Sequence, residues 1–193
     1  SFLNTTFSVD DDYLVGIDFL EHVYMWKVDG ILFKACTFEN NRSIYSDGYS
    51  LQLGQGIYSL DANYRVLAGC SEIQGSGQPC PPEDLEPCVF RGLDHGIDAS
   101  DAATQRNFVV QQARFENNVC GVYANGVVGF EVHQSDFILG KRTLNLSNPS
   151  EQHWGGRHRG IYSYGSYGFL VDDDSLWLDP NATTTLTEGI VTG

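Results

Sequence analysis

The chain has 193 residues, of which 41% are hydrophobic, 12% aromatic and 19% charged, and 21 are glycine, which suits one folded domain or one extended solenoid. This composition excludes a disordered chain and a charged coiled coil. The chain has 25 acidic and 11 basic residues, a net charge of −14, so we expect no nucleic-acid partner. No apolar run approaches ~20 residues, so we expect no membrane span in this segment.

The first clear element is a pair of predicted strands at 30–38, which introduces a repeat. A Gly or Asn is followed by alternating apolar residues, a break of two residues, a small residue and a final apolar residue. Further copies stand at 107–115, 129–137 and 168–176, and Cys88–Phe90 supplies the end of another. Alternation with period two indicates strands, and we interpret the break as a corner between them.

A second predicted strand follows each corner and begins with glycine. It reads Gly, Ile or Val, Tyr or Asp, Ser or Ala, with copies at 56–59, 96–99, 121–124 and 160–163. The shortest full period, Phe108 to Phe130, is 22 residues, enough for three short strands and three turns. The sequence therefore predicts an all-β fold, a right-handed parallel β-helix that forms a single-stranded solenoid of about seven coils. We expect the following residues to form one inward-facing ladder: Phe38, Phe90, Phe115 and Phe137.

Inserted segments interrupt this repeat at about 42–55 and about 139–159. Phe38 to Gly56 spans 18 residues and Phe137 to Gly160 spans 23, where the regular spacing is six. Both insertions interrupt the same step of the coil, so they should emerge on one side, where repeat proteins commonly bind partners. Aromatic and polar side chains in them are candidates for contact with a sugar or a protein: Tyr45, Tyr49, His153, Trp154, Arg157 and His158. The alternative is that Trp154 caps its own loop while the arginines pair with local acids.

A third insertion, at about 69–88, carries the disulfide candidates Cys70, Cys80 and Cys88. The segment contains Gly, Pro and acids and has little to pack, so a disulfide within it would stabilise it in an oxidising compartment. Cys36 and Cys120 lie in strand patterns, where we expect small buried residues.

Two groups of acids raise the question of catalysis or metal binding. If the chain is an enzyme, the best candidates are Asp94, His95, Asp98 and Asp101, because glycoside hydrolysis needs paired carboxylates and Asp98 replaces the Tyr of the other repeats. A second group could hold Ca²⁺, the only cofactor considered: Asp172, Asp173 and Asp174. Solvated turns are the alternative for both groups.

Several stretches resemble segments of exported β-helix proteins of Bacteroidota, which are cargo of the type IX secretion system, and more distantly the pectate-lyase-like fold. The stretches are 4–7, 22–23, 26–30, 36–41, 56–62, 90–93 and the two FENN strings. The resemblance covers most of residues 4–176 and implies a secreted or cell-surface location. It also implies that residues 1–193 are one β-helix segment of a longer parent chain, with flanking domains of that chain as partners.

Two functions remain open at this stage. One is a non-catalytic module serving adhesion, glycan contact or structural spacing, with a polysaccharide or another surface protein as partner. The other is a polysaccharide-degrading lyase or glycoside hydrolase. The strings typical of polygalacturonases are absent, so the module is the preferred expectation.

Overall fold

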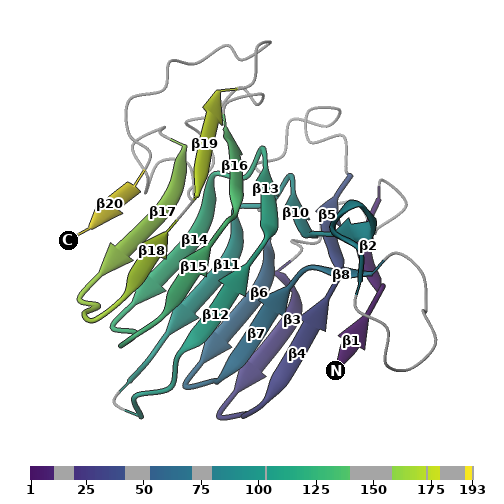
Figure 1. Ribbon diagram of the computed structural model, residues 1–193. Helices are drawn as coiled ribbons and strands as arrows, with labels where there is room; N and C mark the ends of the chain where they lie inside the picture. Colours follow the sequence, from purple (N-terminus) through teal and green to yellow (C-terminus); the bar gives the residue numbers. More distant parts are fainter. Residues whose placement is uncertain are drawn as a thin grey trace.

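Each coil of the chain consists of three short strands, one in each of three parallel sheets (Figure 1). The computed structural model describes residues 1–10, 20–41, 53–70, 80–102, 104–139, 158–172, 174–178 and 190–192. Neighbouring strands within a sheet come from successive coils and pair in parallel, so the chain is a parallel β-helix. No helix in the described residues is long and apolar enough to cross a membrane.

The three sheets are named here in the order in which each coil visits them. Sheet A contains β1 (Phe2–Leu3), β4 (Ile31–Lys34), β7 (Tyr64–Leu67), β12 (Phe108–Gln111), β15 (Glu131–His133) and β18 (Leu170–Asp172). Sheet B contains β2 (Thr6–Val9), β5 (Thr37–Asn40), β10 (Cys88–Arg91), β13 (Ala113–Glu116), β16 (Asp136–Leu139) and β19 (Ser175–Leu178). Sheet C contains β3 (Glu21–Trp26), β6 (Gln55–Leu60), β11 (His95–Ser100), β14 (Cys120–Asn125), β17 (Arg159–Tyr164) and β20 (Ile190–Thr192). Six strands per sheet give six coils in the described residues, against about seven expected, because long insertions lengthen several coils.

The phenylalanine ladder predicted from the repeat is confirmed. Phe38, Phe90, Phe115 and Phe137 are paired in register along sheet B and are at most 2% exposed. Their rings stack nearly parallel, with centroids 4.7, 4.9 and 4.8 Å apart, and Phe7 continues the ladder at 4.8 Å from Phe38. Stacked coils thus bury one continuous core that no single coil could form.

The glycine at the second position of β6, β11, β14 and β17 makes room for this ladder. A Cβ on Gly121 would lie 2.7 Å from the ring of Phe137 and 2.6 Å from the carbonyl oxygen of Gly160. Gly96 has the same relation to Phe115. The glycine and phenylalanine repeats are therefore two parts of one packing contact between neighbouring coils.

A column of small or polar residues forms the corner between sheets A and B. Its members are Thr5, Cys36, Cys88, Ala113, Ser135 and Asp174. Side chains of this corner column accept a backbone N–H from the preceding coil: Cys88 Sγ from Cys36 at 3.2 Å and Asp174 Oδ1 from Ser135 at 2.7 Å. The column therefore links successive coils where the chain turns.

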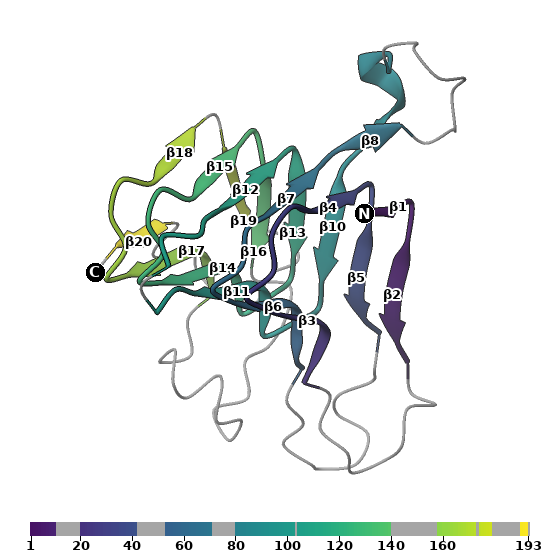
Figure 2. The ribbon, with the colours of Figure 1, turned by 90° about the horizontal axis from the view of Figure 1, so that it is seen from below.

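The inserted segments leave the coil at two different corners. Segment 42–55 joins β5 to β6 and segment 139–159 joins β16 to β17, so both lie at the corner between sheets B and C. Segment 69–88 instead leaves between sheets A and B, at the opposite end of the sheet B strand from the other two. It contains β8 (Gly69–Cys70), a 3₁₀ turn at Pro82–Asp84 and β9 (Leu85–Glu86), which pairs antiparallel with β8; Figure 2 shows β8 and the helical turn projecting from the body.

The disulfide in this segment joins Cys70 and Cys80. Cys88 is not part of it, contrary to its place among the candidates, because β10 carries its side chain into the corner column, where it is free and fully buried. Cys36 and Cys120 are also free and buried.

Candidate functional site

The outer face of sheet A presents two rows of side chains, with one residue from each of five successive coils in each row. One row contains Leu32, Arg65, Val109, Glu131 and Leu170, and the other contains Lys34, Leu67, Gln111, His133 and Asp172. The second row is polar or charged except at Leu67, whereas charged and apolar residues alternate along the first row. These side chains occupy the positions between the inward-facing residues of each strand.

A groove of about 380 Å³ crosses this face of sheet A. Its lining comes from β7, β12, β15 and β18, with one residue just after β15: Arg65, Val109, Gln111, Glu131, His133, Gln134 and Asp172. Arg65 and Asp172 stand three strands apart, which is about 14 Å at the strand spacing of a sheet. The groove therefore runs along the stack and draws on four successive coils.

The charges in the groove are mixed and accessible to solvent. His133 Nε2 lies 3.1 Å from Glu131 Oε2, and the Glu131 side chain remains 45% exposed. Arg65 and Asp172 are exposed. The arrangement offers guanidinium and amide donors beside carboxylate acceptors, which suits hydroxyl-rich ligands. Among the described residues, no group of three His, Cys, Asp or Glu side chains is arranged to hold a metal ion.

Sheet C carries a column of tyrosines on its outer face, and Asp98 interrupts it. The column reads Tyr24, Tyr58, Asp98, Tyr123 and Tyr162. Asp98 Oδ2 accepts a hydrogen bond from Gln55 Nε2 at 3.0 Å and lies 3.3 Å from His95 Nδ1. The His95 ring stacks on Tyr123 with centroids 5.6 Å apart.

The Asp98–His95 pair is thus brought together as a cluster, and both side chains are largely buried. Asp98 is only 7% exposed. Burial and the negative charge of Asp98 raise the pKa of both Tyr58 and Tyr123. The pair is better placed to organise the surface of sheet C than to meet a substrate.

The other two catalytic candidates hold turns together. Asp94 Oδ2 accepts the backbone N–H groups of Leu53 and Gly54 at 2.9 and 3.2 Å, which fastens the end of one coil to the next. Asp101 Oδ1 accepts both the N–H and the hydroxyl of Thr104. Both residues therefore hydrogen-bond within turns, but Asp94 is only 4% exposed, so the solvated-turn alternative does not describe it.

Most of the ligand candidates in the insertions lie outside the described residues: Tyr45, Tyr49, His153, Trp154 and Arg157. His158 is described, and it is buried, with Nδ1 2.8 Å from the carbonyl oxygen of Asn118. It therefore packs against the neighbouring coil.

Of the three acids considered for Ca²⁺, the two that the structure describes have different surroundings. Asp172 lines the groove of sheet A, and Asp174 belongs to the corner column, where its hydrogen bond to Ser135 is structural. Burial raises the pKa of Asp174, as expected for a carboxyl drawn into the corner. Asp173 lies outside the described residues.

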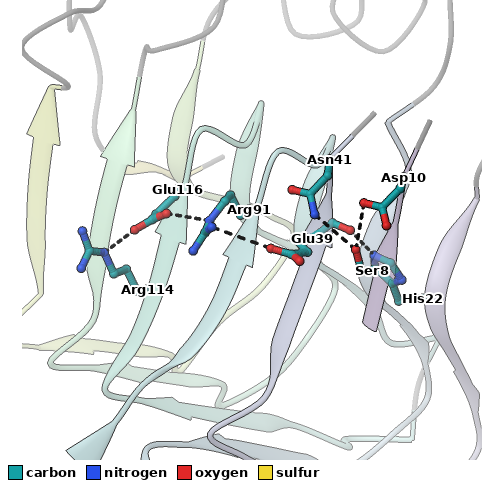
Figure 3. A network of polar contacts seen from close by, with 8 residues as sticks. All are labelled: Ser8, Asp10, His22, Glu39, Asn41, Arg91, Arg114 and Glu116. Carbon is teal, nitrogen blue, oxygen red and sulfur yellow. Dashed lines mark hydrogen bonds and ion pairs between the residues drawn. The ribbon is translucent and has the colours of Figure 1, made fainter. Parts of the chain in front are cut away.

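The outer face of sheet B holds a network of ion pairs between coils (Figure 3). Arg91 Nε lies 2.9 Å from Glu116 Oε2, and its Nη1 lies 3.7 Å from Glu39 Oε2. Arg114 Nε approaches Glu116 Oε1 at 2.6 Å. Since these charges neutralise one another, the network is a contact between coils and we do not assign a ligand to it.

Comparison of the chain with protein-family models, curated proteins and solved structures gave no match. The three outer faces differ in their geometry. Of these, sheet A has the groove, sheet B has self-paired charges and sheet C has a closed aromatic column.

The residues of the groove were not recognised from the sequence. They stand at the variable positions between the apolar residues of the repeat, where no single residue type recurs. Aligning the repeats and reading down these variable positions would have placed Glu131 and His133 next to Gln111 and Asp172. The variable positions of the aligned repeats are therefore the sequence signal that indicates the residues of the groove.

Proposed function

We propose that the chain is a non-catalytic module of a secreted or cell-surface protein and that it contacts an extended glycan along the groove of sheet A. The observation that carries this proposal is the groove itself, which has donors and acceptors from four successive coils. Successive coils offer contacts at about 4.8 Å intervals along the stack, so an extended polymer can meet several of them at once.

The chemistry of the lining favours a polysaccharide over a protein partner. Arg65 and Gln111 supply hydrogen-bond donors, and Glu131 and Asp172 supply acceptors, while Val109 is a small apolar contribution among the lining residues. Hot spots of protein interfaces are enriched in Trp, Tyr and Arg, and of these residue types the described lining has Arg65 alone. Vicinal hydroxyls, by contrast, can satisfy donors and acceptors together.

An enzymatic function is the second candidate, because the groove has two carboxylates from neighbouring coils. Glu131 and Asp172 are diagonal neighbours on adjacent strands. The residue positions of such neighbours are typically about 7–8 Å apart. Inverting glycosidases hold their carboxyl groups about 6.5–9.5 Å apart. A general acid also needs a water-excluded environment, whereas the Glu131 side chain is 45% exposed and already faces His133. This exposure favours the binding module.

The disulfide supports the proposed export. Cys70 and Cys80 form a disulfide, and such bonds persist in oxidising compartments. The resemblance to Bacteroidota cargo proteins is the basis for proposing type IX secretion and a longer parent chain with flanking domains.

Binding of the chain to a panel of polysaccharides, measured by affinity electrophoresis and calorimetry, tests the proposal. We expect Arg65→Ala and Gln111→Ala each to weaken binding about 10-fold, the usual effect of losing a hydrogen bond to a polar ligand. Arg114→Ala is the matched control, because it removes an exposed arginine from sheet B. Equal loss of binding in the control, or no binding of the wild type to any glycan, would contradict the proposal.

An assay for reducing ends and unsaturated products, with and without Ca²⁺, separates the two candidates. Turnover that Asp172→Asn or Glu131→Gln abolishes would replace the module with an enzyme acting in the groove. Turnover abolished by Asp98→Asn would instead place catalysis on sheet C.

A further inference from the structure

Two thiols are neighbours in the corner column between sheets A and B. Cys36 and Cys88 lie in register on successive coils, since Thr37 pairs with Val89, and both are fully buried. The backbone N–H of Cys36 donates to Cys88 Sγ at 3.2 Å. Neighbouring strands are about 4.8 Å apart, which falls within the Cα separation of about 4.4–6.8 Å that a disulfide spans.

The corner itself does not require cysteine. Ala113 and Ser135 occupy the same column in the next two coils. Ser135 Oγ accepts the N–H of Ala113 at 3.2 Å and donates to the carbonyl oxygen of His133 at 3.0 Å. Cys88 makes the same two contacts through sulfur, with Cys36 and Leu67. A hydroxyl would thus serve the fold equally well, so adjacent cysteines add a reactivity that the corner does not need.

The ionisation of the pair suits oxidation. When Cys36 is ionised, its sulfur accepts a hydrogen bond from the Cys88 thiol, which lowers the pKa of Cys36 and, together with burial, raises the pKa of Cys88. A thiolate beside a protonated thiol is the reactant pair of thiol–disulfide exchange.

We propose that Cys36 and Cys88 are a second disulfide site, which joins two successive coils along the axis of the solenoid when a disulfide oxidant acts on them. The Cys36 thiolate attacks one sulfur of the oxidant, either a small disulfide or a thiol–disulfide oxidoreductase. This forms a mixed disulfide and releases one thiolate of the oxidant. Cys88 then loses its proton and attacks Cys36 Sγ, which forms the protein bond and releases the second thiolate. Two protein thiols are oxidised and one disulfide of the oxidant is reduced.

The oxidant can reach Cys36 from the side of β1. Cys36 Sγ lies 3.5 Å from the carbonyl oxygen of Phe2, so β1 covers the sulfur. β1 has only two residues, and the side chains of Phe2 and Leu3 are 37% and 57% exposed. Short strands with few buried contacts open locally at low cost, and such opening uncovers the thiol without unfolding the stack.

The test is to incubate the folded chain with oxidised glutathione, quench it with acid and count thiols in denaturant. The Cys70–Cys80 bond leaves three free cysteines. We expect the thiol count to fall from three to one, the intact mass to fall by about 2 Da, and peptide mapping to identify a Cys36–Cys88 link. The thermal midpoint should rise by roughly 10 °C, because the link closes a loop whose ends are 52 positions apart in the sequence.

Cys120→Ser is the matched control, because Cys120 is buried and free but has no cysteine beside it in the column of sheet C. In this variant the count should fall from two to zero. Ser135 in the same column shows that serine is compatible with the corner. The variants Cys36→Ser and Cys88→Ser should therefore fold, retain Cys120 and be unable to form the link. A folded wild-type chain that keeps three thiols, a stable glutathione adduct on Cys36, or a link from Cys88 to Cys70 or Cys80 would each overturn the proposal. The outcome is independent of glycan binding, which involves the outer face of sheet A.

Discussion

His22 occupies a position that glycine fills in the following coils. It lies beside Gly56 in sheet C, and its ring faces those of Phe7 and Phe38, with centroids 6.3 Å away in both cases. The carbonyl oxygen of Glu39 lies 3.1 Å from Nε2. Burial lowers the pKa of His22 to about 4, although the hydrogen bond and the charge of Glu39 oppose this effect. The coil therefore requires a neutral imidazole.

This makes the stability of the chain dependent on pH. The folded pKa of about 4 lies below the ordinary value of 6.5, so between these values the unfolded chain binds more protons at His22. The stabilising contribution is complete above pH 6.5 and is lost as the pH falls toward 4. We expect the free energy of unfolding from urea titrations to drop more steeply over this range in the wild type than in His22→Gln. His133→Gln, a change on the outer face, should retain the wild-type slope. Parallel slopes for the wild type and His22→Gln would contradict the prediction.

At the scale of the strand, the charges of sheet B show how neighbouring coils are held in register. Glu116 forms ion pairs with both Arg91 and Arg114. Glu39 forms one longer ion pair, with Arg91 at 3.7 Å. The two glutamate side chains are equally exposed, at 18% and 17%, which makes them a matched pair.

We expect Glu116→Gln to lower the free energy of unfolding by about 1 kcal/mol, since two partly exposed ion pairs are lost together. Glu39→Gln should cost less than half of that. Urea titrations at low and at 1 M salt provide the measurement, and the difference between the variants should shrink in salt because screening weakens surface pairs. Equal losses for both variants would show that the network adds nothing beyond packing.

The elements that the sequence predicted are those set by recurring residue types. The phenylalanine ladder, the glycine column and the shared corner of segments 42–55 and 139–159 follow from the spacing of Phe and Gly, because in-register stacking requires the same residue type in each coil. The groove could not be predicted in this way, since Arg65, Gln111 and Asp172 meet only after the strands are stacked. Sequence distance groups Cys88 with the cysteines of its insertion, whereas the pairing of β10 with β5 places it next to Cys36.

At the scale of the molecule, three sheets give three outer faces of different chemistry on one shared core. The groove of sheet A is open to ligands, the ion pairs of sheet B satisfy one another, and Asp98 and His95 are enclosed within the tyrosines of sheet C. Each coil packs only on its neighbours, so the stability of such a stack is close to a sum of contacts between adjacent coils. Substitution of a given residue type should then lower the free energy of unfolding most in a coil that has neighbours on both sides.

Phe115 and Phe7 test this dependence on position. Phe115 stacks on Phe90 and Phe137 and is 1% exposed, whereas Phe7 ends the ladder in the described part of the chain and is only partly buried. We expect Phe115→Ala to cost about 3–5 kcal/mol, the usual range for a fully buried phenylalanine. Phe7→Ala should cost less than half of that, because it leaves one ring face unpacked instead of two. Urea unfolding followed by far-UV circular dichroism measures both, and Phe115→Leu with Phe7→Leu repeats the comparison if the alanine variant does not fold. Equal losses at the two positions would mean that the coils do not unfold as a stack of nearest neighbours, and the core would then behave as a single globule.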